Sequence, residues 1–363
     1  MLNQITWLRQ AGVEIDVVGT TKGPDLPGVR YFVVNQLSLI QRLFSYVALR
    51  PNERFKKLVI RRTDESVWDR LSKGFYSHLV LNDLDFVPLL AHPDHVAPGT
   101  HVHLDLHEYF PGTKGPLIWE ITQRKYLDWL IEESRRIVTS SNSTVSAELC
   151  SEYQTYYPGM VFRPITNAPQ VGQTAFEPRE SRVINVIYHG NTGKGRSLVR
   201  ILWAFRTIGE KFTLTYMLVC SPAKRLGFKL FAWAIGLSTS FRILNPVKTS
   251  EITKTVEKFD LGIMMLPPVF RNLEFAFPNK LFETVAAGAG VICGESKSMA
   301  NLVRENQLGV VVPGWSAKAL REAITSISRE QVEVFRQNAS SSRVDLEWEK
   351  SRSTFLECLG LNR

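Results

Sequence analysis

The chain has 363 residues, of which 44% are hydrophobic and 22% charged, and this composition excludes a disordered protein and favours two globular domains. Its four cysteines, Cys150, Cys220, Cys293 and Cys358, lie far apart, which excludes a disulfide framework and predicts reduced thiols in a cytoplasmic protein. The net charge is +9, and the most apolar segment, residues 230–237, is shorter than the roughly 20 residues that span a bilayer.

The first predicted element is a helix over residues 2–12, because Ile5 and Leu8 have helical spacing and Gly12 ends the pattern. A doubly wound domain normally opens with a strand and a glycine-bearing loop, so the first strand of this domain is missing. We hypothesise that the natural protein begins upstream with that strand; the alternative is a domain built without it.

Short apolar segments then alternate with amphipathic helices, and this alternation predicts an α/β fold with parallel sheets. Strands are predicted at residues 13–18, 31–34, 78–81, 102–106, 136–140, 161–165, 183–188, 213–219, 241–244, 261–266, 291–293 and 310–312. Residues 163–181 carry three prolines and little periodicity, which predicts a boundary. It divides a first Rossmann-like domain, residues 1–165, from a second, residues 182–345, with residues 166–181 as the linker.

A strongly basic segment lies between Arg42 and Arg62, where seven basic residues accompany one acid, Glu53. Three interpretations are open: a solvated helix face, an anionic membrane surface, or nucleic acid. No recognition helix or aromatic platform for nucleic acid is visible, so a nucleic-acid partner is not expected.

Two stretches of the second domain predict a phosphate site. A strand, a loop with Gly190, Gly193 and Gly195, and a helix follow one another, and Lys194 and Arg196 lie in the loop. This glycine order differs from the G-x-G-x-x-G of dinucleotide-binding proteins, so NAD is not indicated.

The second stretch, FPNKLFETVAAGAGVICGE (residues 277–295), predicts a helix that begins at Pro278 and ends at Gly288. Lys280 lies in its first turn, where a cation opposes the helix dipole. Either Lys280 is solvated and paired with Glu283, or an anion binds at that helix end. Both stretches follow strands whose carboxyl ends hold ligands in doubly wound sheets, which favours a diphosphate there, with Glu283 accepting from ribose hydroxyls.

The sequence resembles GT-B nucleotide-sugar glycosyltransferases, in particular glycosyltransferase family four. PNKLFETVAAGAGVI is similar to the donor-site signature of that family and YHGNTGKGRSL to its phosphate-binding loop. LNDLDFVPLL and VHLDLHEYFP are similar to two strand-end stretches of the first domain, and LEWEKS to the segment before a terminal helix, residues 346–363, that returns to that domain.

The resemblance implies two Rossmann-like domains facing across a cleft, and transfer from a nucleoside-diphosphate sugar with retention of configuration and without a metal. The implied acceptor is a saccharide or lipid-linked molecule of the cell envelope, at the inner face of the membrane.

The resemblance also implies roles for single residues. Glu283 matches the glutamate that holds the ribose, Lys194 or Arg196 the basic residue on the diphosphate, and His107 the histidine near the sugar and acceptor. Lys280 lies where the motif approaches the phosphates or the sugar, so the expected catalytic residues are His107, Glu283 and Lys280. The expected donor-binding residues are Gly190, Gly193, Lys194, Gly195, Arg196, Asn279, Lys280 and Glu283.

Three departures from the family pattern are visible. Phe275 stands where the first of two paired glutamates is usual, with Glu274 one position earlier, and Asn191 replaces an arginine. The glycine loop after the first strand is absent. A GT-B protein that binds nucleotide sugars without transferring them, or an epimerase, is therefore the alternative.

Two further alternatives rest on other side chains. Six histidines, His78, His92, His95, His101, His103 and His107, lie close in sequence, and a zinc hydrolase would need such ligands. Asp83 and Asp85 form a D-x-D triplet, which resembles the metal motif of the GT-A architecture.

Overall fold

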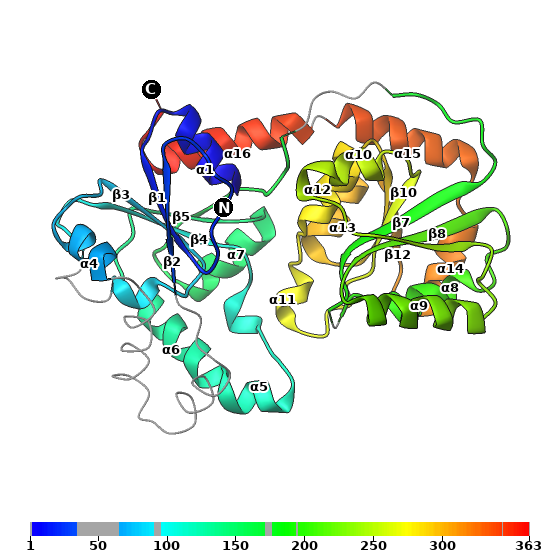
Figure 1. The fold of residues 1–363 in the computed structure, drawn as a ribbon, viewed down its shortest axis with the longest axis horizontal. Coiled ribbons are helices and arrows are strands. Elements are labelled where there is room, and N and C mark those ends of the chain that lie inside the picture. Colours follow the sequence, from blue (N-terminus) through cyan, green and yellow to red (C-terminus); the bar gives the residue numbers. More distant parts are fainter. Residues whose placement is uncertain are drawn as a thin grey trace. The chain divides into compact units, whose positions relative to one another are not determined.

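The computed structural model describes residues 2–34, 65–90, 96–170, 176–193, 195–342 and 344–362 (Figure 1). The basic segment between Arg42 and Arg62 lies outside these residues, as do His92, His95 and Lys194. The chain divides into two compact units, one formed by Met1–Thr166 with Lys350–Arg363 and the other by Asn167–Glu349. Within the described ranges, no helix combines the length and the apolar character needed to cross a membrane.

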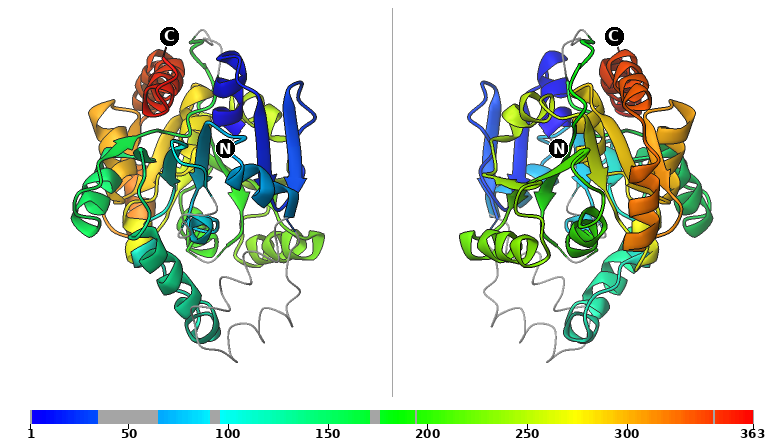
Figure 2. Two further views of the ribbon diagram at one scale, coloured as in Figure 1. Left: turned by 90° about the vertical axis from the view of Figure 1, so that its left-hand side faces the viewer. Right: turned by 90° about the vertical axis from the view of Figure 1, so that its right-hand side faces the viewer.

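The first unit contains two parallel sheets. Strands β1 (Ile15–Gly19) and β2 (Val29–Val33) lie side by side (Figure 2), and a second sheet has the order β3 (His78–Asn82), β4 (His101–Leu106), β5 (Ser141–Thr144), β6 (Phe162–Pro164). Among the residues described, β1 pairs with β2 alone and β3 with β4 alone, so the doubly wound pattern is incomplete in this unit. Its helices are α1 (Leu2–Gln10), α4 (Glu65–Ser72), α5 (Leu117–Thr122), α6 (Arg124–Ser134) and α7 (Ala147–Tyr156).

One predicted strand is wrong. Residues 136–140 form no strand, and the chain pairs instead over β5, whose sequence is Ser-Asn-Ser-Thr. These polar side chains tolerate burial because they are hydrogen-bonded: the Ser143 hydroxyl donates to Asp105 Oδ1 (2.6 Å) and the Thr144 hydroxyl to the carbonyl of Leu106 (2.6 Å). Val138, from the apolar run that suggested a strand, is 91% exposed.

The end of the chain packs on the first unit. Helix α16 (Val344–Cys358) buries Phe355, whose ring lies 5.6 Å from the ring of Trp7 and 5.6 Å from that of His103. The next carbonyls are close to strand histidines: His101 Nε2 lies 2.7 Å from Cys358 O, and His78 Nε2 2.9 Å from Leu359 O. The core of this unit therefore includes residues from both ends of the chain.

The second unit is a six-stranded parallel sheet (Figure 1). Its order is β12 (Gly309–Val312), β11 (Gly290–Gly294), β10 (Leu261–Met264), β7 (Ile184–Asn191), β8 (Phe212–Val219), β9 (Phe241–Leu244). Its helices are α8 (Leu198–Phe205), α9 (Pro222–Ala234), α10 (Ile252–Val256), α11 (Arg271–Glu274), α12 (Asn279–Ala286), α13 (Lys297–Glu305), α14 (Ala317–Thr325) and α15 (Arg329–Ser341). From β7 the chain builds outward to β8 and β9, and from β10 in the opposite direction to β11 and β12. The strand order therefore reverses between β7 and β10, where doubly wound sheets bind their ligands.

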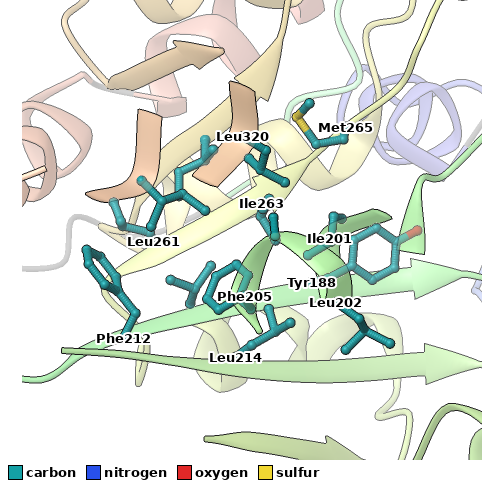
Figure 3. Packing of buried hydrophobic residues seen from close by; sticks show 14 of the residues in the cluster. Tyr188, Ile201, Leu202, Phe205, Phe212, Leu214, Leu261, Ile263, Met265 and Leu320 are labelled. Atoms are coloured by element: carbon teal, nitrogen blue, oxygen red, sulfur yellow. The ribbon is translucent and has the colours of Figure 1, made fainter. Parts of the chain in front are cut away.

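Apolar residues of the central strands fix this switch point (Figure 3). Val186 and Ile187 of β7 pair with Leu261 and Gly262 of β10, and the sheet is covered on one side by Ile201, Leu202 and Phe205 of α8 together with Leu320 of α14. The continuous apolar runs of the sequence thus correspond to strands buried on both faces, as predicted. The loops that follow β7 and β10 therefore begin at strands that are held in place by a packed core.

The close pairing of β11 and β12 gives a test of this packing. A Cβ atom added to Gly309 would lie 1.8 Å from the backbone oxygen of Val291, so Gly309→Ala forces the two strands apart. We expect a fall of several degrees in melting temperature, measured by circular dichroism. Gly227→Ala in α9 is the matched control, because its added methyl meets nothing within 4 Å and removes a helix glycine, a gain of about 0.5–1 kcal/mol. Equal melting of the two variants would contradict this packing.

Candidate functional site

Two helices begin at the switch point of the second unit, and neither start is capped by a side chain. Helix α8 follows Ser197, which has a left-handed backbone (φ 53°), and α12 follows Pro278; neither residue's side chain accepts from the first turn. The starts of α9, α14 and α15 in the same unit are capped by serine hydroxyls, whereas those of α10, α11 and α13 also lack a side-chain cap. Uncapped N–H groups and the positive end of the dipole make α8 and α12 suited to an anion.

Lys280 joins α12 to the end of β7. Its ammonium donates to the Tyr188 hydroxyl (3.1 Å) and lies 4.3 Å from the centroid of the Tyr188 ring. Gly190 has φ 123°, and a Cβ there would come 3.2 Å from Lys280 Nζ, so glycine leaves room for the ammonium. The Tyr188 hydroxyl in turn donates to the carbonyl of Asn191 (2.7 Å). Lys280 is therefore not a solvated surface lysine.

This position lowers the pKa of Lys280 to about 7. Burial is the main cause, because a desolvated ammonium loses its hydration, and the charge of Arg196 adds to the effect while Glu283 opposes it. The Lys280 amine is thus charged only in part at neutral pH. A bound anion would favour its charged form.

Glu283 contacts a residue that sequence reasoning missed. His189, which is 4% exposed, places Nε2 3.0 Å from Glu283 Oε2, one turn of α12 after Lys280. The two residues are 94 positions apart, and no sequence signal joined them. The contact fixes one carboxylate oxygen and leaves Oε1 for a ligand. The alternative in which Lys280 pairs with Glu283 is not what the structure shows: Lys280 contacts Tyr188, and Glu283 contacts His189.

The glycine loop lies beside these groups. Asn191 is the last residue of β7, and its side-chain oxygen accepts from the backbone N–H of Gly193 (3.2 Å), so the residue that replaces the usual arginine shapes the turn. Gly195 has φ 85°, which favours glycine. A second missed residue, Lys224 of α9, donates to the carbonyl of Thr192 (3.1 Å) and brings a cation to the loop. Asn279, at the start of α12, is exposed.

Phe275, the departure from the paired glutamates, is buried. It is 4% exposed, and the Lys297 ammonium lies 4.8 Å from the centroid of its ring. Lys297 also lies 3.7 Å from a carboxylate oxygen of Glu274, the acid one position earlier. The Phe275 side chain is thus packed, and the neighbouring carboxylate faces a cation.

His107 belongs to the first unit, at the carboxyl end of β4. Nδ1 lies 3.2 Å from Asp83 Oδ1, and Nε2 3.3 Å from Asp105 Oδ2. Burial lowers the pKa of His107, but the carboxylates of Asp105 and Asp83 outweigh it and raise the pKa above its usual value. Asp105 also accepts from Gln4 Nε2 and the Ser143 hydroxyl, each at 2.6 Å. His107 therefore holds its proton more strongly than a free imidazole does, within a fixed polar cluster.

The remaining described histidines of the first unit have structural partners. His78 and His101 contact carbonyls of the chain end, and His103 lies 2.8 Å from the Ser141 hydroxyl and 2.9 Å from that of Ser143. Burial lowers the pKa of His103 to about 4. Across the described ranges, no group of three or more His, Cys, Asp and Glu side chains is arranged to hold a metal ion. The zinc-hydrolase alternative thus gains no support from these residues.

A groove of about 970 Å³ borders the glycine loop on another side. Gly193, Gly195 and Arg196 line it together with Trp203 of α8, Phe228 of α9 and Trp315, but neither Lys280 nor Glu283 does. Its lining mixes these aromatic side chains with Arg196, Arg200 and the glycine loop at the start of α8. The groove therefore shares the glycine loop and Arg196 with the candidate anion site at Lys280.

Comparison with known proteins shows the fold. No protein-family model and no curated protein matches the chain. Among solved structures, the chain is similar to sucrose-phosphate synthase from Thermosynechococcus elongatus, with a TM-score of 0.71, 14% identity, and coverage of 97% of this chain and 89% of that one. It is also similar to Anabaena HepE in complex with UDP and glucose, with a TM-score of 0.68, 12% identity, and coverage of 99% and 94%.

A third similar structure is a TarM variant from S. aureus in complex with fondaparinux, alpha-GlcNAc-glycerol and UDP, with a TM-score of 0.62 and 9% identity. It covers 81% of this chain, and the chain spans 58% of TarM's length. At these identities the similarity shows the fold alone, and that fold is GT-B, as the sequence resemblance implied. The GT-A architecture suggested by Asp83 and Asp85 is therefore wrong.

The buried amine of Lys280 predicts a dependence of stability on pH. Because its folded pKa of about 7 lies below the ordinary 10.5, the unfolded chain binds more protons between these values, and the stability of the parent rises as pH increases from 7 towards 10. Lys280→Met removes the amine and keeps an apolar stem. We expect its melting temperature to exceed that of the parent by several degrees at pH 7 and below, with the difference shrinking towards pH 10.

Thermal melts of both proteins from pH 6 to pH 10 measure this difference. Lys297→Met is the matched control, since the Lys297 side chain is 54% exposed and its removal relieves no comparable burial. A Lys280→Met protein that melts below the parent at every pH would show that the lysine stabilises the empty fold.

Proposed function

We propose that the protein is a glycosyltransferase that takes a sugar from a nucleoside-diphosphate donor bound in the second unit. The observation that carries the proposal is the position of Lys280, a desolvated cation with a pKa of about 7 held against Tyr188 and Gly190 at the switch point. Two uncapped helix starts lie at the same point. A fold does not need these features for its own stability, and a diphosphate would compensate each of them. The GT-B fold supports the same conclusion.

The donor would bind with its diphosphate between the starts of α8 and α12. Lys280 would contact the phosphates, with Arg196 and the N–H groups of Gly193 and Gly195 on the other side. Lys194, outside the described residues, and Asn279 are further proposed contacts. Glu283, with one oxygen fixed by His189, would accept from the ribose hydroxyls through the other. Charge-assisted hydrogen bonds of this kind are stronger than neutral ones.

The proposed catalysis rests on stabilising the negative charge that develops on the leaving diphosphate. In the transfer step the bond between the anomeric carbon and the diphosphate oxygen breaks, and the acceptor hydroxyl forms the new bond and loses its proton. The leaving diphosphate gains negative charge, which Lys280, Arg196 and the helix starts would stabilise without reorganising. We propose retention of configuration from the resemblance to family four, together with a role for His107 near the sugar. The family resemblance implies that this step proceeds without a metal.

Uridine diphosphate is the first donor nucleotide to test, since the HepE and TarM structures both contain UDP. We propose a saccharide or lipid-linked acceptor of the cell envelope or of a polysaccharide, used at the inner face of the membrane by a cytoplasmic enzyme. The basic segment between Arg42 and Arg62 would bring the protein towards anionic lipid.

A second candidate function rests on Phe275. Its buried ring replaces a carboxylate that would face the sugar hydroxyls, so a GT-B protein that binds the donor without transfer, or an epimerase, is the competing proposal. Both functions need the same nucleotide site. Release of free nucleotide from its sugar only when an acceptor is present distinguishes transfer from the other two.

Nucleotide binding depends on Glu283 if the proposal holds. Glu283→Ala removes a charged acceptor for two hydroxyls, and a loss of about 1.5–3 kcal/mol corresponds to UDP affinity weaker by roughly 10- to 150-fold. Calorimetric titration measures the affinity, and a thermal melt checks that the variant stays folded. Glu305→Ala, an exposed acid at the end of α13, is the matched control. UDP affinity equal to that of the parent in Glu283→Ala would place the nucleotide elsewhere.

Binding of UDP should also take up a proton. At pH 8 free UDP is fully ionised, because its last phosphate pKa is about 6. Lys280, with a pKa of about 7, is then mostly neutral in the empty site and becomes charged beside the diphosphate. Titrations in buffers of different ionisation enthalpy should therefore report uptake of a large fraction of one proton in the parent and much less in Lys280→Met. Proton release, or no exchange in the parent, would contradict direct contact of Lys280 with phosphate.

A further inference from the structure

Helix α9 of the second unit turns an apolar stripe towards solvent. Leu226, Leu230 and Trp233 follow each other at helical spacing of four and three residues and are 56%, 56% and 70% exposed. Ala232 is the one residue of this thirteen-residue helix that is buried. An amphipathic helix that packs on a sheet normally turns its leucines and tryptophans inward, so this stripe has another role.

The neighbouring helix extends the stripe. Trp203 of α8 is 41% exposed, and its ring lies 6.0 Å from that of Phe231 in α9, so the two helices are side by side (Figure 1). Val199, one turn earlier in α8, is 49% exposed. Val199 and Trp203, with Phe228 of α9, also line the groove of about 970 Å³. We call the surface formed by Val199, Trp203, Leu226, Leu230 and Trp233 the α8–α9 face.

Cations surround this face, and acids are scarce. Residues 181–250 contain eleven basic residues and one acid, Glu210, so this stretch carries more positive charge than the net +9 of the whole chain. Five of the cations belong to α8 and α9 or directly follow them: Arg200, Arg206, Lys224, Arg225 and Lys229. Across the part of the chain that the structure describes, none of the five has a carboxylate partner within ion-pair distance, while many other cations do. The face thus combines exposed apolar side chains with uncompensated positive charge.

We propose that the α8–α9 face docks on a membrane surface that contains anionic lipid. Leu226, Leu230 and Trp233 would enter the boundary between headgroups and acyl chains, where amphipathic helices with leucine and tryptophan on one face lie. Arg225 and Lys229, which flank the stripe, would contact lipid phosphates. The stems of such side chains can lie along apolar surface while their charges stay in the headgroup layer.

The charge and the apolar side chains of the α8–α9 face favour an anionic membrane over a second copy of the chain or a nucleic acid. A second copy of the chain would bring two sets of these cations together across a two-fold interface, which repulsion opposes. Nucleic acid would use the cations but would leave the leucine and tryptophan stripe without a partner. An anionic bilayer offers phosphates to the cations and acyl chains to the leucine and tryptophan side chains. The three α9 residues that would enter the membrane, Leu226, Leu230 and Trp233, do not line the groove beside the glycine loop, so this proposal and the donor site can fail separately.

Co-sedimentation of the full chain with vesicles tests the face. The parent should bind vesicles of phosphatidylglycerol and phosphatidylcholine more strongly than vesicles of phosphatidylcholine alone. The combined variant Leu226→Gln, Leu230→Gln and Trp233→Gln should bind the anionic vesicles at least tenfold more weakly, since it loses most of the apolar area that enters the bilayer. Its melting temperature should equal that of the parent, because the three side chains are already exposed.

The matched control makes the same change on α5 of the first unit, where Leu117, Ile118 and Ile121 are 76%, 73% and 60% exposed. This variant should keep its binding. A third variant, Arg225→Gln with Lys229→Gln, should bind roughly 30-fold more weakly at low salt, from about 1 kcal/mol per cation, and the difference should fall as salt rises.

Four results would overturn the proposal. They are binding of the α9 variant equal to that of the parent, equal losses in the α9 and α5 variants, equal parent binding to neutral and anionic vesicles, and a parent dimer that the α9 variant dissociates without any vesicle binding. UDP titration of the α9 variant separates the proposals, because its donor affinity should match that of the parent whatever the vesicles show.

Discussion

The second unit is organised around one electrostatic constraint, a partly buried ammonium group that has no carboxylate within ion-pair distance among the described residues. Lys280 reaches from the first turn of α12 to the Tyr188 ring and hydroxyl, beneath a glycine whose missing side chain makes the approach possible. The cost of this arrangement appears in the lowered pKa of the amine. It can persist because the apolar strands on both sides of the switch point fix the helix start. The same rigidity keeps the amine available to an anion, since its hydrogen-bond partner among the described residues is the neutral Tyr188 hydroxyl.

The two units use opposite strategies for buried polar groups. In the first, Asp105 is surrounded by donors from Gln4, Ser143 and His107, so its charge is satisfied without a ligand. In the second, the starts of α8 and α12 and Oε1 of Glu283 have no side-chain partner among the described residues. A fully satisfied network gives a stable scaffold, whereas an unsatisfied one gives a site that a ligand completes.

Much of this organisation could be predicted from the sequence, and the reasons for the misses are physical. Apolar runs such as residues 184–188 predict buried parallel strands because each side chain faces a covering helix, and Pro278 with Gly288 marks the ends of α12. The polar strand β5 was missed because its burial is compensated by hydrogen bonds to distant residues, which periodicity does not record. His189 was missed for a similar reason: its partner Glu283 is brought close only by the pairing of β7 with β10. Lys280 was placed correctly in the helix, but its desolvation follows from Tyr188 and Gly190, which no local pattern joins to it.

The contacts of the chain end have a consequence for biosynthesis. The core of the first unit needs Phe355 against Trp7, and its edge histidines need the carbonyls of Cys358 and Leu359. A ribosome makes these residues after every strand of both units has been synthesised. The core of the first unit is therefore completed only after the second unit has been synthesised, in contrast to the usual order in which an N-terminal domain folds first as it emerges. The second unit is one continuous stretch of chain, so it can become compact before the residues of α16 that complete the core of the first unit have been synthesised.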